Sequence, residues 1–231
     1  MTAPAASFAD VAFTYPERDG FALAVPSLEI APGERVACVG HSGCGKTTLI
    51  NLLSGVLVPQ RGEVRVGDVV MSKLSEPERR AQRIRRIGMV FQEFELLDYL
   101  SALDNILLPY RLSPATGDMV AARRRSRALA STLGVGHLLN RKPTRLSQGE
   151  RQRVAVCRAL VTQPDLVIAD EPTGNLDPKN ASGVIELLLE HVTTSGAAML
   201  VVTHNHELLK LFDRVIHLDT LNQQSVAEPS P

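Results

Sequence analysis

Residues 40–47 have the types and the spacing of a loop that binds phosphate. The segment fits the pattern G-x-x-x-x-G-K-[ST]. Its glycines let backbone N–H groups point at phosphate oxygens, Lys46 can reach the β- and γ-phosphates, and the Thr47 hydroxyl can bind Mg²⁺. We therefore predict a nucleotide site formed largely by one continuous run of residues. These are Gly40, His41, Ser42, Gly43, Cys44, Gly45, Lys46, Thr47 and Thr48.

The residues around this loop predict the strand–loop–helix context that such a site needs. Apolar residues 35–39 indicate a short buried strand, and residues 47–53 indicate a helix that Gly55 ends. A helix that starts at the loop adds a dipole that favours an anion. The alternative is a glycine-rich turn that only closes a β–α unit.

Two acidic residues, Asp170 and Glu171, follow the apolar residues 166–169. A buried strand brings side chains to its carboxyl end, where α/β proteins bind ligands. We expect Asp170 to contact Mg²⁺ through its water shell, and Glu171 to take a proton from an attacking water. The alternative is a pair of solvated acids that start a turn before Pro172.

Composition excludes several classes of protein. The 231 residues carry 25 Lys and Arg and 25 Asp and Glu, so no basic excess indicates a nucleic-acid partner. No apolar run approaches the ~20 residues that span a bilayer, and the N-terminus does not read as a signal peptide. We expect a soluble, cytosolic protein.

The three cysteines, Cys38, Cys44 and Cys157, are an odd number without metal-ligand spacing, so a disulfide framework is not expected.

The order of elements indicates an α/β protein with a mostly parallel sheet covered on both faces. We expect two β segments within residues 7–30, a strand and turn at 62–68, a basic helix opened by Ser75 and Glu78, and buried strands at 87–91, 166–169 and 198–202. Residues 95–162 have helical periodicity and form an inserted helical subdomain, in which the basic stretch 123–127 is read as a solvated helix face. Asp177 is expected to cap a helix. From Leu221 to the end we expect a frayed, disordered tail.

Residues 146–153 carry the most specific resemblance. Ser147 and Glu150 fit a capping box for a helix that runs to about Leu160. The segment resembles the signature motif of the ATP-binding subunits of ABC transporters, except that the family commonly has glycine where this chain has Gln148. The resemblance implies that Ser147 and Gly149 contact the γ-phosphate bound by the other protomer, so that a pair of ATP molecules lies between two subunits.

Further positions fall in the order of that family, from about Ser7 to Leu218. Gln92 looks like the glutamine that binds Mg²⁺ and the attacking water, and residues 174–177 look like the loop that crosses the dimer interface. His204 looks like the histidine that contacts the γ-phosphate, and Tyr15 like the aromatic residue that stacks on adenine. Each has a structural alternative: a polar strand end, a helix cap, a structural histidine and a core tyrosine.

The resemblance implies a P-loop NTPase fold over residues 7–220, with a RecA-like core, a small antiparallel β subdomain and the inserted helical subdomain. It implies an ATPase that binds MgATP, dimerises with an identical or similar cassette, and energises a separate membrane permease from the cytoplasmic face. One alternative is a regulatory ATPase of the cell-division type, which moves no substrate. Others are a soluble ABC ATPase of DNA repair or translation, and a simple P-loop kinase.

Three finer expectations follow. Residues 92–97, 104–109 and 170–177 resemble the branch of lipoprotein-release, macrolide-export and cell-division ATPases. In the family, a permease helix docks between the core and the helical subdomain, and here we expect residues 94–108, with Tyr99, to line that groove; the alternative is that they are core.

We also expect Cys44 to be a reactive thiol, because Lys46 and a helix N-terminus both favour a thiolate, while Cys38 stays inert.

Overall fold

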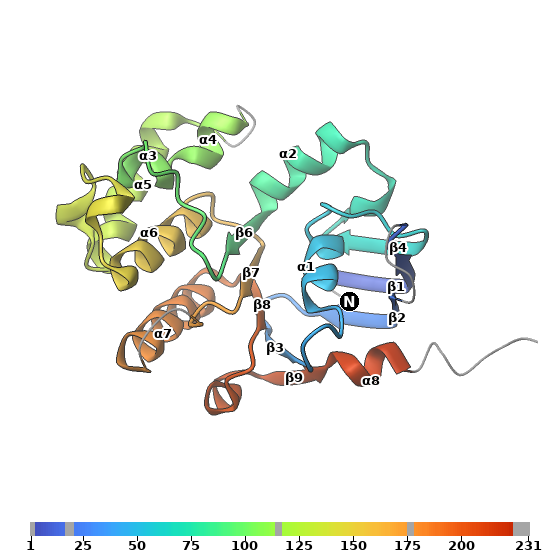
Figure 1. The fold of residues 1–231 in the computed structure, drawn as a ribbon. Helices are drawn as coiled ribbons and strands as arrows, with labels where there is room; N and C mark the ends of the chain where they lie inside the picture. Colours follow the sequence, from blue (N-terminus) through green and yellow to red (C-terminus); the bar gives the residue numbers. More distant parts are fainter. Residues whose placement is uncertain (1–2, 17–20, 114–116, 175–177, 224–231) are drawn as a thin grey trace, which may run out of the picture.

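The computed structural model describes residues 3–16, 21–113, 117–174 and 178–223, which form two β-sheets and a group of helices (Figure 1). The strands are β1 Ala6–Thr14, β2 Ala22–Ile30, β3 Arg35–Val39, β4 Arg61–Val66, β5 Val69–Val70, β6 Ile87–Val90, β7 Leu166–Asp170, β8 Ala198–Val202 and β9 Arg214–His217. The α-helices are α1 Lys46–Leu53, α2 Glu76–Arg86, α3 Ala102–Ile106, α4 Leu108–Leu112, α5 Met119–Thr132, α6 Gln148–Leu160, α7 Pro178–Ser195 and α8 Leu218–Gln223.

The central sheet is parallel, in the order β6-β7-β8-β3-β9. Successive residues of its strands enter different hydrophobic cores, because side chains alternate across a sheet. Val36 and Cys38 of β3 pack into the core that contains α1, whereas Ala37 packs into the core that contains α6 and α7. The predicted parallel sheet with buried strands and both faces covered is therefore confirmed.

A second, antiparallel sheet has the order β2-β1-β4-β5. Helix α1 lies between this sheet and the central one, in contact with β4 and β7 (Figure 1). Leu49, Leu52 and Leu53 of α1 are almost completely buried there. The helix that carries the phosphate loop is thus held between two sheets.

Helices α3 to α6 form the inserted helical region, drawn in green to yellow at the upper left of Figure 1. The Ser75–Glu78 capping box at the start of α2 is present as predicted. Of the basic residues 123–127, Arg123, Arg124 and Arg127 are solvent-exposed, as expected. Arg125 is the exception, since it donates hydrogen bonds to the Tyr110 hydroxyl (2.8 Å) and to the Val161 carbonyl (3.0 Å) at the end of α6.

The C-terminal part of the chain corrects the sequence prediction. Leu221, expected to begin a frayed tail, lies in helix α8, and this helix packs against β2 (Figure 1). The Asn222 side chain accepts a hydrogen bond from the Ala24 N–H (2.9 Å) and donates one to the Ala22 carbonyl (3.0 Å). These bonds satisfy exposed backbone groups of β2, which is an edge strand. Residues 224–231 of the predicted tail lie outside the described residues, as does Asp177, the predicted cap of α7.

Candidate nucleotide-binding site

A cavity of about 670 Å³ lies at the carboxyl ends of the central strands. Residues that follow β3, β6, β7 and β8 meet there, as expected for a ligand site in a parallel sheet. The lining brings together most of the predicted site residues. It consists of Tyr15, Phe21, Gly40, Ser42, Gly43, Gly45, Lys46, Thr47, Thr48, Gln92, Asp170, Glu171 and His204.

The phosphate loop connects β3 to α1. Gly43 (φ 83°) and Gly45 (φ 107°) have left-handed backbone angles that other residues rarely adopt. Gly45 is the N-cap of α1, so the free N–H groups of the first helical turn border the cavity. The Lys46 ammonium donates hydrogen bonds across the loop to the carbonyls of Gly40 (2.7 Å) and His41 (3.0 Å). The lysine is therefore already inside the site, where phosphate oxygens would compete with those carbonyls for it.

Asp170 and Glu171 stand at the end of β7 with different surroundings. Burial raises the pKa of the Asp170 carboxyl, the negative charge of Glu171 raises it further, and the positive charge of Lys46 lowers it. The Glu171 carboxylate is 15% exposed, and its Oε2 lies 2.8 Å from His204 Nδ1. Since Asp170 lacks enough positive charge to offset its burial, a cation bound beside it would stabilise its ionised form.

Aromatic side chains form the other side of the cavity. The Tyr15 hydroxyl and Thr48 Oγ1 are 3.2 Å apart and share a hydrogen bond. The Tyr15 ring packs edge-on against Phe13, at a centroid distance of 4.9 Å, and lies 5.8 Å from the ring of Phe21. Tyr15 thus packs on one side and borders the cavity on the other. Sequence reasoning missed Phe21; its only signal was an aromatic residue soon after Tyr15 in the chain.

The signature segment lies at the N-terminus of α6 and outside the cavity lining. The Ser147–Glu150 capping box is present: the Ser147 N–H donates to Glu150 Oε2 (2.7 Å), and the Ser147 hydroxyl accepts from the Glu150 N–H (3.4 Å). Ser147 and Gln148 are exposed and Gly149 is partly exposed. The structure therefore does not bring these three residues to the phosphate loop of the same chain.

The sequence family described as ABC transporter matches residues 23–174. The chain belongs to the ABC transporter family. A lipoprotein-releasing system ATP-binding protein, LolD, of Pseudomonas fluorescens is 48% identical over 83% of this chain and 83% of its own length. A protein of the same description from Xanthomonas euvesicatoria is 44% identical over 88% of this chain and 82% of its own.

Solved structures agree with this membership. The dimeric bacterial ABC transporter cassette MJ0796 matches with a TM-score of 0.81 and 32% identity, covering 92% of this chain and 93% of its own. The same cassette in a post-hydrolysis dimer bound to ADP and Pi matches with a TM-score of 0.78 over the same shares. This member of the family is accordingly an ATP-binding and ATP-hydrolysing subunit of an ABC transporter. Among the described residues, no helix is long and apolar enough to cross a bilayer.

Two residues of the ABC phosphate loop do not line the cavity. The His41 side chain is 73% exposed, and its Nδ1 lies 2.5 Å from Asp219 Oδ1. Cys44 is buried, and burial raises the pKa of its thiol more than Lys46 lowers it. The premise for a reactive Cys44 is therefore wrong, because desolvation of the thiolate outweighs the nearby positive charge. Cys38 is fully buried, and burial raises the pKa of its thiol to about 12, which supports the prediction that it is unreactive.

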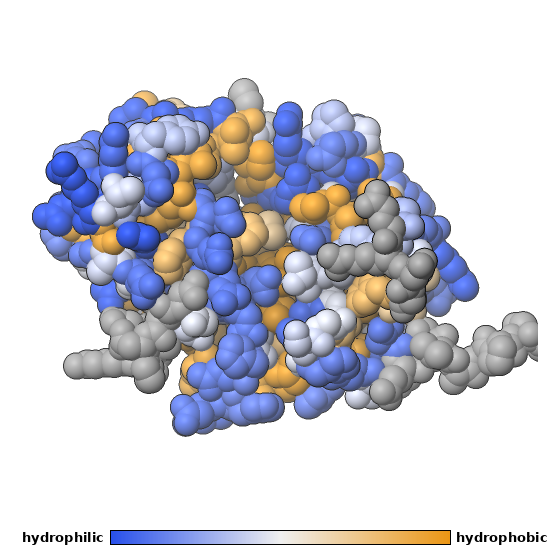
Figure 2. All heavy atoms as spheres, in the orientation of Figure 1, coloured by the Kyte–Doolittle hydropathy of each residue, from blue (hydrophilic) through white to orange (hydrophobic). Residues whose placement is uncertain are grey.

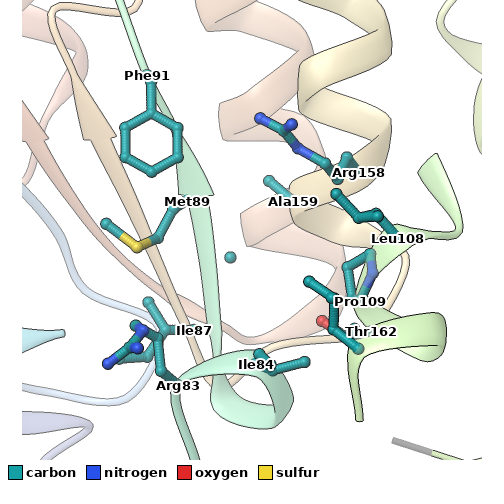
Figure 3. A pocket seen from close by; sticks show the side chains of 12 residues that line it. Arg83, Ile84, Ile87, Met89, Phe91, Leu108, Pro109, Arg158, Ala159 and Thr162 are labelled. Carbon is teal, nitrogen blue, oxygen red and sulfur yellow. The ribbon is translucent and has the colours of Figure 1, made fainter. Parts of the chain in front are cut away.

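The groove between core and helical region of this ABC subunit also differs from the prediction. The sequence predicts that residues 94–108 line this groove, but of this segment only Leu108 does so. Phe94 is buried and Tyr99 is 71% exposed, and neither lines the groove. A groove of about 210 Å³ opens instead between α2, β6, α4 and α6 (Figure 3), and apolar side chains gather there between α2 and α4 in Figure 2. It is lined by Arg83, Ile84, Ile87, Gly88, Met89, Phe91, Leu108, Pro109, Leu112, Arg158, Ala159 and Thr162.

Proposed function

We propose that this chain is the ATPase of a membrane complex that releases lipoproteins. Relatives that are 44–48% identical to this chain, in alignments that cover more than four-fifths of it, are described as ATP-binding proteins of a lipoprotein-releasing system. The chain would act on the cytoplasmic face of the membrane, as a dimer of cassettes, and energise a separate permease. ATP hydrolysis by this chain is supported by one observation: the same cavity is lined by Lys46, Asp170, Glu171 and His204.

The residues of the cavity fit a magnesium ion. Mg²⁺ prefers oxygen ligands and usually takes one or two carboxylates together with phosphate oxygens and water. The Thr47 hydroxyl, the Gln92 amide oxygen and the Asp170 carboxylate are such ligands and line the same cavity. The raised pKa of Asp170 is consistent with a carboxylate that a cation would stabilise. When bound, Mg²⁺ would neutralise charge on the phosphate groups.

The remaining side chains have distinct roles in the proposed hydrolysis. Lys46 would exchange its two carbonyl partners for the outer phosphates. Glu171 would accept the proton of the attacking water, and His204 would hold the Glu171 carboxylate in place. Tyr15 would stack on the adenine ring. Ser147 and Gly149, exposed at the start of α6, would complete the site of the other protomer.

The apolar groove fits a helical segment of the permease. Ile87 and Met89 of β6 line it together with Phe91, which follows that strand (Figure 3). Leu112 of α4 also lines it and is 60% exposed. Arg83 and Arg158 also line it and would suit acidic or carbonyl groups at the end of such a helix. Because Phe91 precedes Gln92, a helix in this groove would lie next to the nucleotide cavity.

Reconstitution tests the proposal. The chain and its permease would be placed in lipid vesicles with a bound lipoprotein, and release of that lipoprotein would be measured with MgATP, with MgADP and with the Glu171→Gln variant. We expect release with MgATP and the wild-type chain alone. ATPase activity that the permease stimulates without release of any lipoprotein would instead indicate a regulatory ATPase.

A further inference from the structure

The carboxylate of Asp219, in the first turn of α8, contacts the back of the phosphate loop. Its Oδ2 accepts a hydrogen bond from the His41 N–H (3.3 Å), and its Oδ1 lies 2.5 Å from His41 Nδ1. The Cys44 thiol lies beside the same carboxylate; burial raises the pKa of that thiol, and the negative charge of Asp219 raises it further. A single side chain from the C-terminal segment thus contacts His41 and lies beside Cys44, and none of these three residues lines the cavity.

The space behind the loop is closely packed. A Cβ atom placed on Gly40 would lie 2.5 Å from Cys44 Sγ and 3.3 Å from Asp219 Oδ2. Since real Cβ atoms essentially never lie within 3.0 Å of another heavy atom, a side chain at position 40 would force the Cys44 thiol to move. The loop therefore has little freedom to move towards α8.

Helix α8 is itself well anchored. Leu218 is fully buried, and Asn222 hydrogen-bonds the backbone of Ala22 and Ala24 in β2. Strand β2 follows directly on Phe21, which lines the cavity. Through α8, the phosphate loop is connected to the aromatic side of the site.

The contact between Asp219 and His41 also affects how the Lys46 side chain is positioned. The His41 N–H, which donates to Asp219, belongs to the same peptide group as the Gly40 carbonyl, and that carbonyl accepts a hydrogen bond from the Lys46 ammonium (2.7 Å). Since a peptide group is planar, holding its N–H also orients its carbonyl. The His41 side chain contacts Asp219 as well, and the His41 carbonyl accepts hydrogen bonds from the Lys46 ammonium (3.0 Å) and from the Cys44 N–H (3.3 Å). The contact from Asp219 thereby restricts the backbone from which Lys46 and the following N–H groups are presented.

We propose that Asp219 is a positioning residue for nucleotide binding, which pre-orders the phosphate loop from behind through His41 and Cys44. A loop that is already ordered loses less conformational freedom when the nucleotide binds. Asp219 lies beyond residues 23–174, the part that matches the ABC transporter family. The inference rests on ATP binding at this site and is independent of the permease and its substrate.

Asp219→Asn tests the proposal, with Asp213→Asn as its matched control. Asp213 precedes β9, and its carboxylate accepts hydrogen bonds from the N–H (2.9 Å) and the guanidinium of Arg35. Arg35 is the first residue of β3, so these contacts lie at the end of the strand opposite to the phosphate loop. Both substitutions remove one negative charge from the same C-terminal segment. The Kd for MgATP, the KM and kcat of hydrolysis, and the thermal unfolding midpoint would be measured for each.

We expect Asp219→Asn to raise Kd and KM by about three- to tenfold, the scale of one lost charged contact at a partly exposed site, with kcat changed less than about twofold. Asp213→Asn should leave Kd and KM at wild-type values even where it lowers the unfolding midpoint. His41→Ala, at an exposed side chain, should raise Kd less, and the double variant with Asp219→Asn should show less than the sum of the two effects.

An unchanged Kd in Asp219→Asn, or an equal rise in both Asp variants, would overturn the proposal in favour of a purely structural role. If Asp219→Asn does not fold, His41→Ala alone decides: wild-type affinity in that variant also overturns it. A wild-type chain that binds no MgATP would refute the proposed function, and this inference with it. Wild-type binding combined with normal affinity in the variants refutes only the role of Asp219.

Discussion

Glu171 and His204 are joined through both side chain and backbone. Glu171 Oε2 lies 2.8 Å from His204 Nδ1 and 3.4 Å from the His204 N–H, while the Glu171 N–H donates to the Val202 carbonyl (2.9 Å). Glu171 also has a left-handed backbone (φ 44°), which is uncommon outside glycine and asparagine. The ends of β7 and β8 therefore hold this carboxylate in one orientation at the edge of the cavity.

Glu171→Gln should keep nucleotide affinity and lose turnover. The amide has nearly the shape of the carboxylate but cannot accept the proton, and a positioned general base contributes about 10²–10⁴-fold to the rate. The variant should also accumulate as an ATP-bound dimer on size-exclusion chromatography. Near-normal hydrolysis in this variant, measured beside an active wild type, would exclude Glu171 as the base.

Much of the fold and of the cavity was predictable because local sequence patterns determine them. The apolar runs at β3, β7 and β8 and the glycine spacing of the phosphate loop each encode a local structure with a defined end. Asp219 and Phe21 gave no comparable signal, since their roles depend on which distant segments pack together. The signature residues Ser147 and Gly149 were assigned only through family resemblance, because their proposed partner is another chain.

Cys44 illustrates where local reasoning fails. From the sequence, Lys46 and the helix N-terminus favour a thiolate, but the folded chain buries the thiol, and burial raises its pKa. We expect iodoacetamide at pH 7.5 to label Cys44 in the native protein more slowly than in the unfolded protein. The Cys44→Ser variant identifies the labelled site by mass spectrometry. Native labelling faster than that of the unfolded chain would show that the helix and Lys46 dominate after all.

Cys38 should make the protein less stable in alkali. Burial raises the pKa of its thiol from 9.0 to about 12, so the folded state retains this proton more strongly than the unfolded state. Its contribution to stability is complete below pH 9 and is lost as the pH rises towards 12. Urea unfolding at several pH values should show a shallower loss for Cys38→Ala than for wild type, whatever the stability of the variant at pH 7. Parallel pH curves would contradict the assignment.

Arg158 of α6 should stabilise the turn that follows Gln92. Phe94 and Glu95 have left-handed backbones (φ 63° and 49°), and the Arg158 guanidinium donates hydrogen bonds to both of their carbonyls, at 2.6 Å for Phe94. Lysine has a single terminal nitrogen and lacks the planar fork with which two guanidinium nitrogens reach these two carbonyls. Arg158→Lys should therefore cost about 1–3 kcal/mol of stability and accelerate amide exchange in residues 93–97.

Arg151→Lys is the control for Arg158, because Arg151 also lies on α6 and its Nε donates to two carbonyls, those of Pro143 (3.0 Å) and Leu146 (3.1 Å). Hydrogen exchange should accelerate around residues 143–146 in that variant and leave 93–97 unchanged. Acceleration of both segments in both variants would mean that α6 loosens as a whole, without a specific role for Arg158 in the turn.

Leu112→Glu and Tyr99→Glu distinguish two surfaces for the permease. Leu112 is 60% exposed and lines the apolar groove, whereas Tyr99 is 71% exposed and lies in the segment that the sequence indicated. A carboxylate at position 112 would lose its contact with water once an apolar helix covers the groove, and this desolvation is costly. We expect Leu112→Glu to abolish co-purification with the permease from detergent and its stimulation of ATPase activity. Tyr99→Glu should retain both.

Both of these variants change exposed side chains outside the nucleotide cavity, so each should fold and bind MgATP as the wild type does. That measurement separates loss of docking from loss of structure. If Tyr99→Glu abolishes binding to the permease while Leu112→Glu does not, the docking surface is the segment 94–108, and the groove between α2 and α4 has another role. If both variants bind the permease normally, neither surface is the docking site.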